Sequence, residues 1–166
     1  MIRKTLLAAA IASLALQAQA ASVTFKFDSD GFDAGTLIGQ TLNGQFSFDD
    51  AALTAATEWL PVSSFSFQLG GQTYTLTGEE LGAAAATFSN GQLNGVEAVA
   101  MNVATRAFSF VGGSFGAPYV FYIDSEGTDL GAANLSFTAA VPEPQTYALM
   151  LGGLGLIGWM ARRRKA

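Results

Sequence analysis

The sequence predicts an all-β body, an antiparallel two-sheet sandwich or jelly roll, flanked by an N-terminal signal peptide helix and a C-terminal transmembrane helix. Apolar and polar residues alternate with a period of two through most of residues 21–140, which is typical of half-buried antiparallel strands. All 13 phenylalanines lie in this range, so the buried faces carry enough bulk for one core. Two facing sheets would bury those faces between them, and an up-and-down barrel is the alternative architecture.

The expected strands follow one another along the body, eight to ten in all. Their inward positions are Val23, Phe25, Phe27, Phe46, Phe48, Phe65, Phe67, Leu69, Tyr74, Leu76, Phe108, Phe110, Leu135 and Phe137. Gly70-Gly71 and Asn90-Gly91 lie between neighbouring runs, and both pairs suit two-residue hairpin turns that need positive φ. One short helix is expected near residues 50–58, with Asp49 or Asp50 capping its N-terminus.

The composition removes most catalytic chemistry. The chain has no cysteine and no histidine, which excludes thiolate nucleophiles, Ser-His-Asp triads, Cys/His zinc sites and disulfides. Between residues 21 and 140 only Lys26 and Arg106 are basic, against twelve acidic residues, so this body carries a net charge of −10. A body this acidic lacks the basic footprint that nucleic acid requires. We therefore expect a protein that is not an enzyme, needs no cofactor and does not bind nucleic acid.

The first 20 residues have the three parts of a secretory signal peptide. Arg3 and Lys4 supply the positive start, and an uncharged run of eleven residues follows at 6–16. Ala18 and Ala20 then provide the small side chains that signal peptidase requires, which places the cut before Ala21. We expect the body at residues 21–140 to be exported.

The last 26 residues, 141–166, also fall into three parts. Pro142, Glu143 and Pro144 form an extended break, because the two prolines exclude both a helix interior and a central strand. An apolar helix is expected at 147–161, about 23 Å long and thus marginal for a hydrocarbon core of about 30 Å. A basic cluster follows, consisting of Arg162, Arg163, Arg164 and Lys165. This cluster predicts a stop-transfer signal that keeps the tail inside and the body outside.

These three parts in this order at the C-terminus resemble the PEP-CTERM sorting domain of Gram-negative bacteria, a domain also associated with the C-termini of ice-binding proteins. The resemblance implies that an exosortase, a membrane-embedded processing enzyme, recognises Pro142, Glu143 and Pro144 and removes the helix. It further implies a precursor anchored transiently in the inner membrane, and a mature form at the cell surface or outside the cell. The usual context of the family is the export of surface, matrix or biofilm proteins in bacteria that make exopolysaccharide.

One acidic cluster is a weak candidate for a calcium site. Asp28, Asp30 and Asp33 offer three carboxylates within six residues, and carboxylate oxygens are the ligands that Ca²⁺ prefers. The spacing does not fit an EF-hand, because glycine occupies the fourth position and Gly39 stands at the twelfth, where glutamate is required. A solvated turn after the first strand is the favoured interpretation. The segment 124–129 is expected to form a similar acidic loop between two strands.

Exposed aromatic side chains could instead stack on sugar rings. The candidates are Trp59, Tyr119 and Tyr122, and core packing is the expected role for two of the three.

Two functions thus remain open for the body. The first is a non-catalytic surface or extracellular-matrix protein, associated with exopolysaccharide, and the second is a glycan- or calcium-binding β module. Signal peptidase and an exosortase are the expected processing partners.

Overall fold

The computed structural model describes residues 22–113, 116–140, 153–154 and 157. The predicted signal peptide at 1–20 lies outside them, together with the cleavage site at Ala21. Most of the predicted transmembrane helix at 147–161 lies outside them as well. Within the described part of the chain, no helix is long and apolar enough to cross a membrane.

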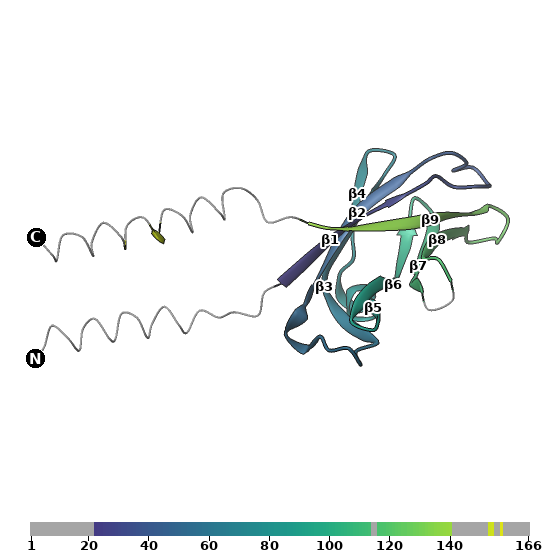
Figure 1. Cartoon of the computed structure of the whole chain (residues 1–166). Coiled ribbons are helices and arrows are strands. Elements are labelled where there is room, and N and C mark those ends of the chain that lie inside the picture. Colours follow the sequence, from purple (N-terminus) through teal and green to yellow (C-terminus); the bar gives the residue numbers. More distant parts are fainter. Residues whose placement is uncertain (1–21, 114–115, 141–152, 155–156, 158–166) are drawn as a thin grey trace, which may run out of the picture.

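The body consists of strands with two short helical segments between them (Figure 1). In chain order the elements are β1 (Ser22–Ser29), β2 (Leu42–Asp49), η1 (Asp50–Ala52), β3 (Trp59–Leu69), β4 (Gln72–Thr75), α2 (Gly78–Gly82), β5 (Ala85–Ser89), β6 (Gln92–Val103), β7 (Arg106–Val111), β8 (Tyr119–Asp124) and β9 (Leu130–Ala139). The all-β class and the number of strands agree with the sequence pattern, and so do the turns at Gly70-Gly71 and Asn90-Gly91.

The strands join into a closed barrel, so the predicted two-sheet sandwich or jelly roll is wrong. Eight strands pair antiparallel in the order β1-β2-β3-β5-β6-β7-β8-β9, and β9 returns to pair with β1. The remaining strand, β4, pairs with the second half of β3. Apart from β4, each strand pairs with its neighbours in the chain, which is the up-and-down connectivity considered as the alternative.

Closure depends on long strands that change partner along their length. The first half of β9, Leu130–Asn134, pairs with β8, and its second half, Leu135–Ala139, pairs with β1. In the same way β6 pairs first with β5 and then with β7. Alternation along a strand reveals a buried face, but this pattern is the same in a sandwich and in a barrel. A sandwich has unpaired edge strands and a closed barrel has none. The alternation along one strand does not show whether both of its edges are paired.

Aromatic rings fill the inside of the barrel. The Phe110 ring of β7 lies 5.6 Å from the Phe27 ring of β1 and 4.9 Å from the Phe65 ring of β3, measured between centroids. These contacts connect opposite sides of the barrel, and all three side chains are almost completely buried. Burial of one such ring contributes roughly 2–3 kcal/mol before the entropy of the chain is subtracted. The core therefore holds the two sides together.

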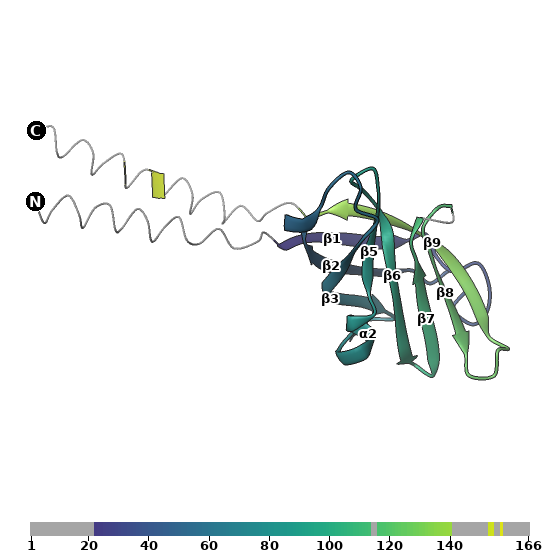
Figure 2. The same ribbon diagram turned by 90° about the horizontal axis from the view of Figure 1, so that it is seen from below.

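The chain enters and leaves the barrel at the same end. Phe25 of β1 pairs with Ala139 of β9, and the N–H of Ala140 donates to the carbonyl of Thr24 over 2.9 Å. Figures 1 and 2 show the start of β1 and the end of β9 side by side. At the other end, the loop of residues 30–41 connects β1 to β2 and places Phe32 and Leu37 in the core.

The helix predicted near residues 50–58 is limited to one 3-10 turn, η1. Asp49 caps this turn as predicted, since its carboxylate accepts from the N–H of Ala51 over 2.9 Å. Beyond η1 the hydroxyl of Thr57 accepts from the N–H of Thr54 over 2.8 Å and closes a local turn. Threonine side chains commonly compete with helical hydrogen bonds in this way, and the helix ends for this reason.

Candidate binding groove and sorting segment

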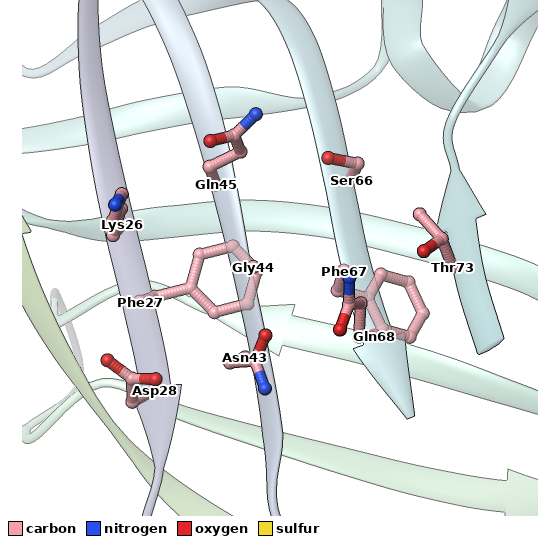
Figure 3. Close-up of a pocket in the computed structure, with 10 residues that line it drawn as sticks. All are labelled: Lys26, Phe27, Asp28, Asn43, Gly44, Gln45, Ser66, Phe67, Gln68 and Thr73. Atoms are coloured by element: carbon pink, nitrogen blue, oxygen red, sulfur yellow. The ribbon is translucent and has the colours of Figure 1, made fainter. Parts of the chain in front are cut away.

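The outward side chains of β1–β4 form a polar wall, and a groove of about 400 Å³ runs into it (Figure 3). The polar side chains that line this groove are Lys26, Asp28, Asn43, Gln45, Ser66, Gln68 and Thr73. Phe27, Gly44 and Phe67 form its floor, and both phenylalanine rings are buried in the core beneath. The groove thus has a polar rim on an apolar base.

The pairing of the strands places the lining side chains in two rows. In the first row Lys26 of β1 lies opposite Gln45 of β2, which lies opposite Ser66 of β3. In the second row, two residues further along each strand, Asp28, Asn43 and Gln68 lie opposite one another in the same order. Two residues along a strand correspond to about 6.7 Å. The rows therefore flank a narrow channel across three strands.

Gly44 allows the strands to approach closely in the middle of this channel. It lies opposite Phe27 on one side and opposite Phe67 on the other. A Cβ atom at this position would clash with the Phe27 ring and with the carbonyl oxygen of Ser66. Glycine inside a strand often marks such a close approach of neighbouring groups. Phe27 consequently lies across Gly44 on the inner face of the barrel.

The groove offers hydrogen-bond donors and acceptors of several kinds. Lys26 contributes an exposed ammonium group and Asp28 an exposed carboxylate. The amides of Asn43, Gln45 and Gln68 can each donate and accept. This mixture suits a ligand with many hydroxyl groups. The groove was not identified from the sequence, because its residues come from four strands and none of them is unusual for an outward strand position.

A second polar cluster lies at the far end of the barrel, where it fastens the loop of residues 30–41. Arg106 of β7 donates through Nε and Nη2 to Oδ2 of Asp129, over 2.8 and 2.7 Å. Asp129 also accepts from the backbone N–H of Thr36 over 2.8 Å and from its hydroxyl over 2.6 Å. The hydroxyl of Tyr122 lies 3.1 Å from Oδ1 of Asp129. Asp129 is therefore shared by the loop, β7 and β8.

The two hydrogen bonds from Thr36, together with those from Arg106 and Tyr122, hold the pKa of Asp129 well below its ordinary value. The carboxylate is thus ionised at any physiological pH. Its oxygens already have donors within the protein, so the cluster is a structural clamp. No motif in the sequence marks this cluster, although the isolation of Arg106, one of only two basic residues in the body, is a signal.

The three aspartates considered for calcium do not converge on one point. Asp30 accepts from the N–H and the side-chain amide of Asn134, over 2.9 and 2.8 Å. Asp33 accepts from the N–H of Ala132 over 2.8 Å. Both carboxylates therefore hold the loop against β9, whereas Asp28 lines the groove on the polar wall. Among the described residues, no group of three acidic side chains could hold a metal ion.

The aromatic candidates for sugar stacking divide differently from the expectation. Tyr122 is fully buried in the core, Tyr119 is half-buried on the outer surface of β8, and Trp59 is 63% exposed at the start of β3. Only one of the three therefore packs in the core, where two were expected. Neither Trp59 nor Tyr119 lines the groove on the polar wall.

The barrel ends immediately before the sequence that resembles a sorting signal. β9 ends at Ala139, and Ala140 still donates to Thr24. The family model of the PEP-CTERM protein-sorting motif matches residues 140–165. The chain carries a PEP-CTERM sorting motif. No curated protein and no solved structure matches the chain.

The PEP-CTERM match confirms the resemblance drawn from the sequence, and it includes Pro142, Glu143, Pro144 and the basic cluster 162–165. These residues lie outside the part of the chain that the structure describes. The motif is a C-terminal sorting signal of exported proteins that an exosortase processes. The chain is therefore the precursor of an exported protein, held at a membrane and then cleaved. The match covers only this C-terminal segment, and it does not extend to the barrel.

Proposed function

We propose that the mature chain is a non-catalytic protein of the cell surface or extracellular matrix, and that the barrel is the exported cargo. One observation supports this proposal above the others. The last pairing of the barrel, between Ala140 and Thr24, falls at the first residues of the PEP-CTERM match. Removal of the following segment would leave all eight strands of the barrel intact. The sorting segment then serves only as a signal that is removed by cleavage.

The test is the mass of the mature protein. The full precursor is produced in a host that has an exosortase and in the same host without it, and the intact mass of the protein is measured. We expect the exosortase host to yield a form that begins at Ala21 and lacks Trp159 and the basic cluster 162–165. The other host should retain the segment in its membrane fraction. A mature form that still carries Trp159 and the basic cluster would contradict the proposal.

We propose glycan binding through the groove as the barrel's activity, because the two polar rows provide donors and acceptors across three strands. The calcium alternative has less support, since Asp30 and Asp33 use their oxygens to hold β9. Titration of the mature protein with the exopolysaccharide of its host tests the proposal by calorimetry. Replacing both Asn43 and Gln68 with alanine should abolish the heat of binding, whereas Ser64→Ala, outside the groove on β3, should preserve it. Equal binding by both variants would exclude the groove.

A further inference from the structure

The two polar rows of the groove continue beyond the strands at its centre, onto β9 on one side and onto β4 on the other. Figure 3 shows the central part of both rows. All of these side chains are polar, and all except the half-buried Ser66 are exposed. The first row consists of Thr138, Lys26, Gln45, Ser66 and Thr75, and the second row consists of Ser136, Asp28, Asn43, Gln68 and Thr73. Each row therefore crosses five strands, a distance of about 19 Å.

A lane about 6.7 Å wide separates the two rows, because they lie two residues apart on each strand. At its level, Phe137 of β9 lies opposite Phe27 of β1, and Tyr74 of β4 lies opposite Phe67 of β3. The rings of Phe27 and Phe67 are buried in the core, and those of Phe137 and Tyr74 pack against it. The bulky side chains of this level therefore fill the barrel. The groove of about 400 Å³ occupies the centre of the lane.

The side chains that line the groove are free to bond a ligand. Among the described residues, no side-chain hydrogen bond or ion pair involves the longer ones, which are Lys26, Asp28, Asn43, Gln45 and Gln68. The carboxylates of the far-end cluster differ, since they already accept from groups of the protein. Hydroxyl groups both donate and accept, so they can bond the groove without breaking a bond within the protein. A chain of sugar units offers such groups at regular intervals.

The two rows are electrically balanced within an acidic body. Of its twelve acidic residues only Asp28 belongs to the rows, and Lys26 compensates that charge. Arg106, the other basic residue of the body, is bonded within the far-end cluster. Asp30 follows β1 and Asp49 ends β2, so acidic charge lies just beyond the rows. A polyanion would be repelled by this surrounding charge, whereas an uncharged chain would not.

We propose that an internal stretch of a linear, uncharged polysaccharide lies in the lane and crosses the strands from β9 to β4. This rests on the glycan binding proposed above, and it adds the length, the charge and the direction of the ligand. The rows continue past the groove on both sides, so recognition does not depend on the end of a sugar chain. Affinity depends instead on how many strands the ligand spans.

Fragments of the host exopolysaccharide, separated by length, test the proposal by calorimetry with the mature protein. We expect the affinity to rise with length and to level off once a fragment spans about 19 Å. A single sugar should bind about a hundredfold more weakly, because it reaches the side chains of only one or two strands. The affinity should change little between about 0.02 and 0.5 M salt, since binding neutralises no net charge.

The double variant Thr75→Val with Thr138→Val tests the two ends of the first row, because neither residue lines the groove. Valine has a similar shape and preserves strand propensity, but it removes the hydroxyl group. We expect this variant to bind long fragments about tenfold more weakly and short fragments as wild type does. The matched control is Ser89→Ala with Ser125→Ala, which removes two exposed hydroxyl groups outside the rows. It should bind every fragment as wild type does.

The outcomes separate this proposal from the one on which it rests. If a single sugar binds as tightly as the long fragments, the groove binds glycans but the lane is not used. A double valine variant that binds long fragments like wild type, or an affinity that falls steeply with salt, would likewise overturn the proposal. If neither the polysaccharide nor any fragment binds, glycan binding itself is wrong, and this inference is wrong with it.

Discussion

At the scale of single residues, Asp129 is the carboxylate on which the polar cluster at the far end of the barrel converges. It joins the loop of residues 30–41 to β7 and β8 through Thr36, Arg106 and Tyr122. Hydrogen bonds to a charged group are stronger than those to a neutral one, and each donor left without its acceptor adds a cost. The conformation of the loop, which carries Phe32 into the core, should therefore depend on this carboxylate.

Asp129→Asn should destabilise the fold in a pH-dependent manner. The pKa of Asp129 is lower in the folded state than in the unfolded state, where it is about 3.9. Above that value the carboxylate is ionised in both states and contributes its full stabilisation. As the pH falls below about 4, the unfolded state gains a proton that the folded state does not, and this stabilisation is lost. The difference between wild type and variant should therefore be largest at neutral pH and shrink on acidification.

Urea unfolding of both proteins at a series of pH values measures this difference. Glu126→Gln is the control, because it removes one exposed acidic charge from the neighbouring turn and should change stability little at any pH. A difference between Asp129→Asn and wild type that is the same at pH 3 and pH 7 would show that the charge of this carboxylate is unimportant.

At the scale of elements, Gly44 allows β2 to pack against both of its neighbouring strands, β1 and β3. Its position allows the Phe27 ring and the Ser66 carbonyl to occupy the space that a side chain would fill. Gly44→Ala should therefore destabilise the protein by about 1–3 kcal/mol through overpacking. Gly82→Ala is the matched control, because Gly82 has open space around it and ends α2 without a positive φ. That change should be neutral or stabilising by up to about 1 kcal/mol. Equal unfolding midpoints for both variants would contradict this account.

The strand pattern also explains which elements the sequence could predict. β1, β2 and the second half of β3 alternate clearly, since one side of each strand faces the core and the other belongs to the polar wall. β8 shows no alternation, because Tyr119, Phe121 and Ile123 on its outer side are as apolar as Val120 and Tyr122 on its inner side. The period of two is hidden there because the outward side chains of β8 are apolar as well.

At the scale of the whole molecule, the sequence predicts the targeting segments at its two ends better than it predicts the closure of the barrel. The targeting segments are contiguous, so their order and spacing can be read directly, and the PEP-CTERM match confirms the C-terminal one. The groove depends instead on the register between Lys26, Gln45 and Ser66, which is set by long-range pairing. Barrel closure depends on the return of β9 to β1 across more than a hundred residues. Local patterns contain neither piece of information.

The return of β9 leads to the last prediction. A chain of residues 21–140 contains all the pairings of the barrel and should fold cooperatively without metal or disulfide. A chain that ends at Asn134 lacks the half of β9 that pairs with β1, and it loses Phe137, whose ring lies 5.9 Å from Phe46 and 6.2 Å from Phe27. Removal of a fully buried ring costs about 3–5 kcal/mol, and the loss of the partly buried Phe137 should cost less than this. The exposed edge of β1 also invites pairing between chains. Circular dichroism and urea unfolding should therefore show a stable β-rich domain for the longer chain and an unfolded or aggregating product for the shorter one. If the two chains unfold at the same urea concentration, closure by β9 does not stabilise the barrel, and its stability must come from the core of the remaining strands alone.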